Sequence, residues 1–500
     1  MGTISYSVIN IVPSSKEGHS WNSAGHKTGL VTDSVIDGTP QTEILDRYDV
    51  VIIGTGFAGL VAARNLNRAP NTKILLVEGR DRIGGRTWTA KSMGEEFEMG
   101  GTWVHWNQPH VYSEIHRYNL QGNLKTSAGT ASAKCTTYTA AFSTPRILDG
   151  GETASATQRA ADAFFCIDGL SSRDLMPYPH DPMRQPALWM KYDHLSAKDR
   201  LDQLEIPQIE KDLFDGMISS FGSAPGSHCG FTEVLRWYAL GGHSMAGAFE
   251  HAGIFKLGKG GMTSLARSII SEYRGHVLLE TTIDAVEQDK NGVTLFGKNG
   301  RKFQASYVLS TIPLNCLSDV KFTPPLSPLR QEAVNAGHIN QGAKIHFKLR
   351  QTEHGWFSMA SGYGVSPWCF SFSDHNGAST KDGTYCIGFG YNGHLTDPRA
   401  SSNIISSFKA HLKPDADVEA YLTHDWMNDP LAKGTWSCWG PGSMSKWLSE
   451  LQKPHGRVLF ASADWANGWR GFIDGAIERG VTAGVTIERL LSQDKTACKL

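Results

Sequence analysis

The sequence lacks the features that direct a chain into or across a membrane. No run approaches the roughly 18 consecutive apolar residues that a membrane-spanning helix needs. Residues 1–7 contain neither the basic nor the apolar region of a secretory signal, and Tyr6 stands where N-myristoylation requires Ser or Thr. We therefore expect no membrane span, no secretion and no acyl anchor.

Cysteine pairs and an excess of one charge are also missing. The eight cysteines form no C-x-x-C pair and no zinc-ligand spacing, which predicts reduced thiols and no metal site. Lys and Arg (48) nearly balance Asp and Glu (49), so we expect no nucleic-acid partner. No Ser–His–Asp order or pair of general-acid carboxylates stands out, and His105, His338 and His346 are interpreted as structural.

A glycine-rich segment early in the chain predicts a dinucleotide site. The unbroken apolar run 50–53 is typical of a buried parallel strand. Gly54 would permit a tight turn, Gly56 would let the backbone approach a pyrophosphate, and Gly59 would let the next helix pack closely on the strand. The stretch 60–66 predicts that helix, whose N-terminal N–H groups favour a phosphate.

The segment that follows supports the same interpretation. A second apolar run, 74–77, ends at Glu78, an acidic residue placed to take the ribose hydroxyls of an adenosine. The alternative is a glycine-rich turn in an unrelated α/β fold. Because strand, turn, helix, strand and acid occur in this order, we favour the dinucleotide site. The pattern does not choose between NAD and FAD.

Further motifs resemble those of a known family. Residues 78–86 read Glu-Gly-Arg-Asp-Arg-Ile-Gly-Gly-Arg, residues 98–106 begin Glu-Met-Gly-Gly-Thr-Trp, and residues 464–478 begin Asp-Trp-Ala-Asn-Gly-Trp-Arg-Gly-Phe. These runs resemble the FAD-dependent amine oxidase family, and the resemblance extends over about 46–490. It is closest to the fungal monoamine oxidases. Gly79 replaces the alanine usual in the family, a change between small residues.

The resemblance implies FAD as the cofactor and assigns residues to it. Ile283 would meet the adenine, and Asp464 the ribityl or pyrophosphate hydroxyls. Two adjacent glycines, 100 and 101, would let the backbone approach the flat flavin ring. Asp474 would start a helix over the flavin, although a capped surface helix explains it equally well. The implied cofactor-binding residues are Gly54, Gly56, Phe57, Ala58, Gly59, Glu78, Gly79, Arg80, Gly84, Gly85, Arg86, Thr87, Gly100, Gly101, Thr102, Trp103, Ile283, Ala463, Asp464, Asp474, Gly475 and Ala476.

The same resemblance points to three catalytic residues. Trp436 and Phe472 match the aromatic cage that holds the amine in front of the flavin. Lys344 matches a lysine that holds a water near flavin N5, although its alternating strand, taken alone, favours a solvent-exposed side chain. Thr435 stands where animal monoamine oxidases carry the cysteine linked to the flavin. Threonine cannot form that thioether, so the sequence predicts non-covalent FAD.

The function that the resemblance implies is oxidative deamination of a small primary or secondary monoamine. The amine would reduce FAD and leave an imine, water would convert the imine to an aldehyde or ketone, and O₂ would reoxidise the flavin to give H₂O₂. An L-amino-acid oxidase would need an arginine for the substrate carboxylate, and a polyamine oxidase acidic residues for distal amines. The sequence locates neither set. A flavin-binding scaffold without catalysis is a third alternative, and the intact cage and lysine argue against it.

The expected fold class is α/β, with a Rossmann-type FAD-binding domain and an interleaved α+β substrate domain. The terminal tripeptide Cys498-Lys499-Leu500 resembles the peroxisomal address Ser-Lys-Leu, which predicts an import receptor as partner and the peroxisome, otherwise the cytoplasm, as location. A homodimer is left open. The predicted parts are a loose N-terminal arm at 1–44, FAD-binding segments at 45–125, 258–325 and 431–490, substrate-domain segments at 126–257 and 326–430, and a tail at 491–500.

Overall fold

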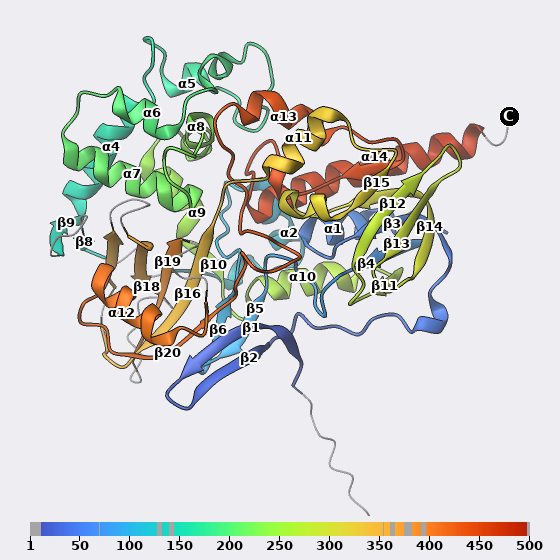
Figure 1. The fold of residues 1–500 in the computed structure, drawn as a ribbon, viewed down its shortest axis with the longest axis horizontal. Coiled ribbons are helices and arrows are strands. Elements are labelled where there is room, and N and C mark those ends of the chain that lie inside the picture. Colours follow the sequence, from blue (N-terminus) through green and yellow to red (C-terminus); the bar gives the residue numbers. More distant parts are fainter. Residues whose placement is uncertain are drawn as a thin grey trace, which may run out of the picture.

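Two β-sheets lie toward opposite ends of the long axis of the molecule (Figure 1). The computed structural model describes residues 12–497, except for residues 70, 128–132, 140–144, 354, 361–365, 375–382 and 392–396. The chain passes between the two sheets several times, because strands of both sheets come from early and late parts of the sequence. The arrangement confirms the predicted fold class.

The first sheet contains the predicted strand–helix–strand unit. The strands β3 (Arg47–Ile53) and β4 (Ile74–Val77) are parallel, and α1 (Phe57–Leu66) connects them. The apolar residues of both strands are buried, which explains why their sequences do not alternate. Three more parallel strands extend the pairing: β11 (His276–Leu278) beside β4, β14 (Lys302–Ser310) beside β3, and β21 (Val458–Phe460) beside β14.

The other part of this sheet is an antiparallel ribbon followed by one parallel strand. The predicted hairpin turn at Asn299-Gly300 is confirmed, since it joins β13 (Val293–Gly297) to β14. The next strands outward are β12 (Ile283–Gln288) and β15 (Lys321–Thr323). Ile283 is the first residue of β12. It lies near the carboxyl end of β4, because β11 ends there, beside Val77, only five residues earlier in the chain.

The long helix α14 (Ile473–Ala497) packs on α1 against this sheet. The backbones of the two helices approach closely: a Cβ on Gly480 would lie 2.3 Å from the Ala58 carbonyl oxygen. Small and apolar residues, including Ala62, Ala483 and Ile487, fill the contact. The helices α2 (Pro109–Arg117) and α10 (Gly261–Ser271) pack nearby. The start of α14 is thereby fixed beside the start of α1.

The second sheet combines strands from the whole chain. The strands within residues 326–430 pair with one another in antiparallel fashion, as predicted. In the described part of the chain its order is β6 (Glu95–Glu98), β5 (Thr89–Ser92), β2 (Gly25–Val31), β1 (Ser14–Asn22), β20 (Val418–Thr423), β16 (Gly342–Leu349), β19 (Thr384–Tyr391), β18 (Trp368–Ser373), β17 (Phe357–Ala360), β8 (Cys135–Thr139) and β9 (Arg146–Asp149).

The prediction of a loose N-terminal arm over residues 1–44 is wrong for residues 14–31. These residues form the hairpin β1–β2, and β1 also pairs with β20 in the second sheet. Their Ser, Thr, Gly and His content suggested a disordered arm. The hairpin is ordered because its backbone hydrogen bonds are made with a strand about 400 residues later, which local composition cannot reveal.

Residues 150–253, which follow strand β9 of the second sheet, are mainly helical. The predicted buried helix that ends before Gly241 is confirmed as α8 (Phe231–Leu240). The remaining helices of the described chain, with a small strand pair, are α4 (Gly150–Phe164), α5 (Ser172–Leu175), α6 (Ala197–Asp202), α7 (Gln208–Gly222), α9 (Met245–Gly253), α11 (Pro328–Ala336), α12 (Ser401–His411), α13 (Ser443–Gln452), β7 (Leu124–Thr126) and β10 (Phe255–Leu257).

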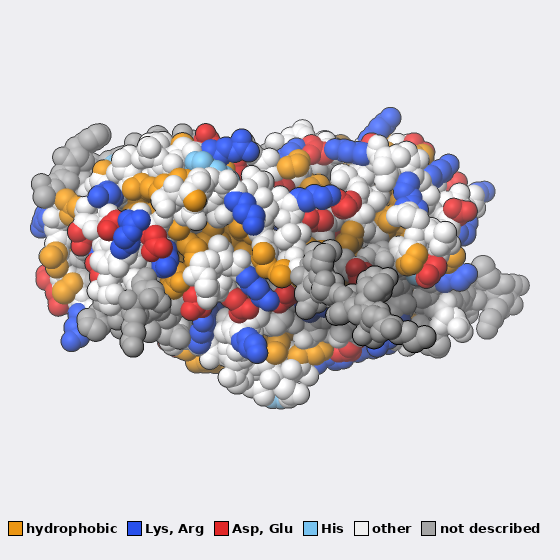
Figure 2. Space-filling model, turned by 90° about the horizontal axis from the view of Figure 1, so that it is seen from below, with side chains coloured by type: hydrophobic (Ala, Val, Ile, Leu, Met, Phe, Trp, Pro, Cys, Tyr) orange, Lys and Arg blue, Asp and Glu red, His pale blue; other side chains and the backbone are white. Residues whose placement is uncertain are grey.

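The surface carries both charges in a mixed arrangement. On the face shown in Figure 2, the basic and acidic side chains are interspersed rather than gathered by sign. Within the described residues, no helix combines the length and the apolar character that crossing a membrane requires.

Candidate active site

The turn after β3 has the geometry that its three glycines predict. Gly54 has a φ of +104°, in the region that favours glycine. A Cβ on Gly59 would lie only 2.0 Å from the Gly54 carbonyl oxygen, so α1 can pack on the turn only with glycine there. A Cβ on Gly56 would meet no protein atom within 4 Å. Because Gly56 lines a cavity, that Cβ would occupy space that a ligand can use.

Glu78 closes the same turn from the end of β4. One carboxylate oxygen accepts hydrogen bonds from the Thr55 backbone N–H and the Thr55 hydroxyl, both at 2.7 Å. The other accepts from the Arg80 backbone N–H at 2.9 Å. Glu78 is buried, yet it lines the cavity. The carboxylate therefore fixes the loops on both sides of it and keeps acceptor capacity toward the cavity.

A continuous cavity of about 800 Å³ runs from this turn to the second sheet. Most of the residues that the resemblance assigned to FAD line it. They are Gly54, Gly56, Phe57, Ala58, Glu78, Gly79, Arg80, Gly84, Gly85, Arg86, Thr87, Gly100, Gly101, Thr102, Trp103, Ile283, Ala463 and Ala476. The Gly56 cradle, the free start of α1 and the acid at β4 fit a dinucleotide such as FAD. Four assigned residues, Gly59, Asp464, Asp474 and Gly475, lie outside the lining.

Asp464 is buried behind the cavity wall and holds Arg86. One of its carboxylate oxygens accepts from the Arg86 guanidinium at 2.7 Å, and the other accepts from the Leu314 N–H at 2.8 Å. Burial would raise the pKa of Asp464, but Arg86 and His338 outweigh burial and keep that pKa below its usual range. Arg86 itself lines the cavity and also donates to the Thr435 carbonyl at 2.6 Å. In the structure Asp464 is linked to the cavity through Arg86, and its contact with FAD hydroxyls stays a prediction.

Asp474 lies in the first turn of α14, as expected, and it also caps a second helix. Its carboxylate accepts from the N–H groups of His110 and Val111, at 2.6 and 2.9 Å, in the first turn of α2. It thus stabilises the start of α2 rather than facing the cavity. The prediction that Asp474 starts a helix over the flavin missed this partner, which lies more than 360 residues earlier. The neighbouring residues Ile473 and Ala476 do line the cavity.

The adjacent glycines at 100 and 101 are required by the protein itself. A Cβ on Gly100 would lie 2.0 Å from the Arg86 carbonyl oxygen, and one on Gly101 would lie 2.6 Å from the Thr87 hydroxyl oxygen. The structure supplies a reason within the protein itself, and the expected approach of a flavin ring to this backbone stays a prediction. The two glycines let the 98–103 segment lie directly on the loop at 84–87, and both segments line the cavity.

Lys344 is buried inside the molecule rather than exposed to solvent. Its Nζ donates to the carbonyl oxygens of Glu98 and Gly100, at 2.7 and 3.0 Å, and to the Thr102 hydroxyl at 2.5 Å. Both faces of β16 are largely covered, so the alternating pattern misplaced this side chain. Burial lowers the pKa of Lys344 and raises that of Glu98, although each charge favours ionisation of the other. Lys344 lines the cavity beside Trp103.

The two predicted cage residues, Trp436 and Phe472, line the same cavity. Trp436 lies in the segment between β20 and α13, and Phe472 directly precedes α14. Trp436 is held by a hydrogen bond from its indole N–H to the Phe221 carbonyl at 2.6 Å. Phe472 packs edge-on against Trp469, with ring centroids 5.0 Å apart. Both side chains are half-buried, so each leaves ring surface for a ligand. The structure therefore places the pair, with Lys344, at one cavity.

The sequence did not reveal how aromatic the far part of the cavity is. Phe370 and Phe372 alternate with serines along β18, a pattern that indicates one apolar face but not what that face covers. The aromatic and methionine side chains added by the structure are Met217, Phe221, Trp237, Phe249, Phe357, Met359, Phe370, Phe372 and Phe389. Their rings come from six different helices and strands, so only the fold brings them together.

Thr435 lies in the cavity wall, and its hydroxyl donates to the side-chain carbonyl of Asn340. Among the described residues, the cavity contains one thiol, that of Cys316, and burial raises its pKa to about 12. A protonated thiol is a poor nucleophile.

We expect acid precipitation to release all FAD into the supernatant, measured by its absorbance, because neither Thr435 nor Cys316 would bind the flavin covalently. A yellow pellet after washing would contradict non-covalent binding.

Comparison with known proteins agrees with the FAD-binding site that the cavity indicates. A family model described as "Flavin containing amine oxidoreductase" matches residues 57–487. Pseudooxynicotine dehydrogenase from a Pseudomonas species is 35% identical over 446 residues, covering 89% of this chain and 87% of that protein. Nicotine dehydrogenase of Pseudomonas putida is 29% identical, covering 89% of each. Among solved structures, cyclohexylamine oxidase from Brevibacterium oxydans has a TM-score of 0.70 at 19% identity, covering 89% of this chain and 99% of that one.

Proposed function

This chain belongs to the flavin-containing amine oxidoreductase family, and we propose that it oxidises apolar, preferably aromatic, monoamines with FAD and O₂. The single observation that carries the substrate class is the lining of the cavity contributed by residues 126–257 and 326–430. Among the described residues of these segments, Lys344 is the only charged side chain in that lining. Aromatic rings and two methionines form most of the remaining wall.

The absence of a carboxylate in this part of the lining argues against diamines. A distal ammonium would lose its hydration without gaining an acidic partner, at a cost of several kcal/mol. A desolvated contact with a ring face returns about 2 kcal/mol, which is less than that cost. The carboxylate of an amino acid would similarly lack an arginine there. An apolar substituent, in contrast, gains about 25 cal/mol for each Å² that it buries.

The residues of this chain position the amine and control its charge. When bound, FAD accepts the two electrons and the hydrogen that the amine carbon loses. Trp436 and Phe472 orient the amine between their ring surfaces. The apolar wall favours the neutral amine, whose nitrogen lone pair must be free for oxidation, because burying an ammonium there is costly. Lys344 supplies the charge that assists O₂ reduction.

The electron acceptor is tested by product analysis, because the names of both curated relatives contain "dehydrogenase". We expect benzylamine to consume O₂ and to yield one H₂O₂ and one benzaldehyde per O₂ consumed. Turnover with an artificial acceptor, but none with O₂, would contradict the oxidase part of the proposal and leave amine oxidation intact.

We also propose import into peroxisomes through the tripeptide Cys498-Lys499-Leu500. These residues lie outside the described part of the chain. The described chain ends with α14, whose C-terminal end at Ala497 projects from the body of the molecule in Figure 1. A fluorescent protein fused in front of residues 1–500 is expected to be punctate with a peroxisomal marker. Diffuse fluorescence of the full-length fusion, identical to that of a fusion ending at residue 497, would contradict import.

A further inference from the structure

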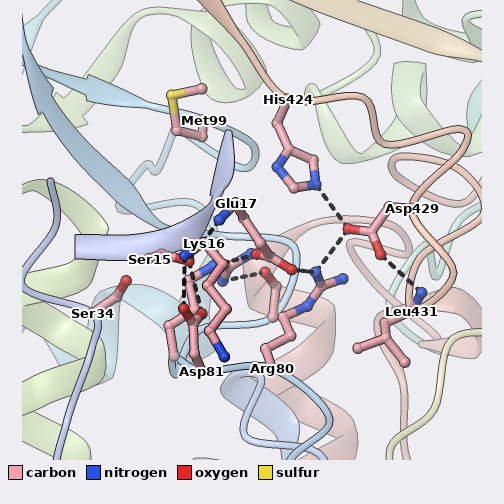
Figure 3. A network of polar contacts seen from close by, with 12 residues as sticks. Ser15, Lys16, Glu17, Ser34, Arg80, Asp81, Met99, His424, Asp429 and Leu431 are labelled. Atoms are coloured by element: carbon pink, nitrogen blue, oxygen red, sulfur yellow. Dashed lines mark hydrogen bonds and ion pairs between the residues drawn. The ribbon is translucent and has the colours of Figure 1, made fainter. Parts of the chain in front are cut away.

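The N-terminal hairpin lies outside the residues that match the family model, yet its first strand contacts a loop that borders the cofactor cavity. The pairing of β1 with β2 is irregular between Ser15 and His19, and Gly18 between them has a φ of +82°. Such a bulge changes the direction of the side chains on its strand. Here it places three consecutive residues, Ser15, Lys16 and Glu17, against the 80–82 loop (Figure 3).

Glu17 forms ion pairs with two buried arginines. Its carboxylate accepts from the Arg82 Nε at 2.7 Å and also pairs with the Arg80 guanidinium. Arg80 has a second carboxylate, Asp429, at 2.7 Å, and Asp429 also contacts His424 (Figure 3). Arg82 is fully buried, and Glu17 is the carboxylate that pairs with it. The remaining hydrogen bonds of Arg82 go to backbone carbonyls.

Ser15 and Lys16, which precede Glu17, bind Asp81, the residue between Arg80 and Arg82. The Ser15 hydroxyl donates to one carboxylate oxygen of Asp81, and the Lys16 backbone N–H donates to the other, both at 2.7 Å. Three hairpin residues therefore bind three consecutive loop residues. This loop connects Gly79, which lines the cavity, to the 84–87 turn, which also lines it.

A direct chain of contacts leads from Glu17 to the cavity wall. Arg82 donates from its Nη1 to the Gly85 carbonyl at 2.8 Å. Gly85 lies against the backbone of Gly56, since a Cβ on Gly85 would be 3.2 Å from the Gly56 Cα. Gly56 and Gly85 thus lie side by side, and both line the cavity at the turn that fits a pyrophosphate. A shift of Arg82 would move one of them.

The charges explain why Arg82 depends on Glu17. Burial lowers the pKa of Arg82 to about 10, even though Glu17 acts in the opposite direction. Burial would raise the pKa of Glu17, but Arg82 and Arg80 together bring it below its usual range. A buried cation without its counter-ion moves toward water or draws water in, because its desolvation is no longer compensated. Arg80 would keep Asp429, whereas Arg82 would keep no carboxylate.

We propose that the N-terminal hairpin is a clamp for the cofactor site, and that Glu17 is the positioning residue that sets the Gly85 wall of the FAD cradle through Arg82. The inference concerns FAD retention and is independent of which amine is the substrate. It assigns a role in the cofactor site to a segment that precedes the family match.

The test compares full-length Glu17→Gln with wild type and with Lys16→Gln. Lys16 is the neighbouring residue, exposed and paired only at the surface with Glu280, so its variant controls for general changes in the hairpin. FAD affinity is measured by titrating apoprotein with FAD at a temperature where circular dichroism shows all three apoproteins folded. We expect E17Q to bind FAD about tenfold more weakly, and K16Q to bind it as wild type does.

A double variant separates positioning from a purely structural role. Glu17→Gln with Arg82→Gln removes both members of the ion pair, so no uncompensated cation remains at this position. We expect the double variant to recover FAD affinity to within about threefold of wild type. Unchanged affinity in E17Q, an equal loss in K16Q, or a double variant that binds FAD no more tightly than E17Q would each overturn the proposal.

Discussion

Replacing Gly56 with alanine is expected to weaken FAD binding roughly 10- to 100-fold while leaving the apoprotein as stable as wild type. The Cβ at this position would meet no protein atom within 4 Å, and Gly56 has an ordinary φ of −68°, so the fold tolerates alanine. The Cβ would instead occupy the cavity where the pyrophosphate is expected. Inserting one methyl group into a filled contact costs about 1–3 kcal/mol, which corresponds to this loss of affinity.

The matched control is Gly59→Ala, three residues further along the same turn. Its Cβ would overlap the Gly54 carbonyl at 2.0 Å, so the helix or the strand must move. We expect this variant to lower the thermal unfolding temperature of the apoprotein by several degrees, since overpacking of this size costs about 3 kcal/mol. Circular dichroism melts and FAD titrations of both variants make the comparison. If G56A binds FAD as wild type does, the cavity does not hold the pyrophosphate at this turn.

Replacing Lys344 with methionine is expected to slow reoxidation of the reduced enzyme by O₂ about 100-fold. A positive charge at the cavity wall stabilises the negative charge that develops on O₂ as electrons arrive. Amine-driven reduction should change by less than about threefold, because the cage and the apolar wall are intact. Stopped-flow absorbance measures the two half-reactions separately. Unchanged rates in both would refute a role for Lys344.

Lys348→Met is the control on the same strand. Lys348 is half-buried and pairs with Glu419 at 3.3 Å, away from the cavity. We expect wild-type rates from this variant.

The pH dependence of the reoxidation rate tests Lys344 independently. Burial lowers the pKa of Lys344, so the ammonium is lost at a pH below the value of about 10.4 usual for lysine. Reoxidation should therefore slow as the pH rises through that lowered pKa, and K344M should lack this transition.

Interactions between neighbours in the sequence were the predictable part of this protein. The turn at 54–59, the acid at Glu78 and the hairpin at Asn299-Gly300 follow from local backbone rules, and the structure has them in place. The Gly84-Gly85-Arg86 run could be assigned to the cavity only through the family resemblance, because its turn has no signature that composition alone would identify.

What could not be predicted depends on partners far away in the chain. Asp474 caps α2 because α14 happens to start beside it, and Gly100 is required by a carbonyl of the 84–87 turn. Lys344 is buried because β16 has cover on both faces, which an alternating sequence does not reveal. The N-terminal hairpin likewise owes its order to β20 and to the arginine loop.

The account rests on one central claim, that an apolar monoamine reduces the flavin in this cavity. Anaerobic mixing of the FAD-loaded enzyme with single amines, followed by absorbance of the flavin band, tests it without dependence on the electron acceptor. Benzylamine, hexylamine, nicotine and pseudooxynicotine represent apolar amines, and putrescine and L-phenylalanine the two excluded classes. We predict rapid bleaching by at least one apolar amine and bleaching at least 100-fold slower with putrescine and L-phenylalanine, since several kcal/mol separate the classes. Fastest bleaching by the diamine or the amino acid, or no bleaching by any amine, would contradict the claim.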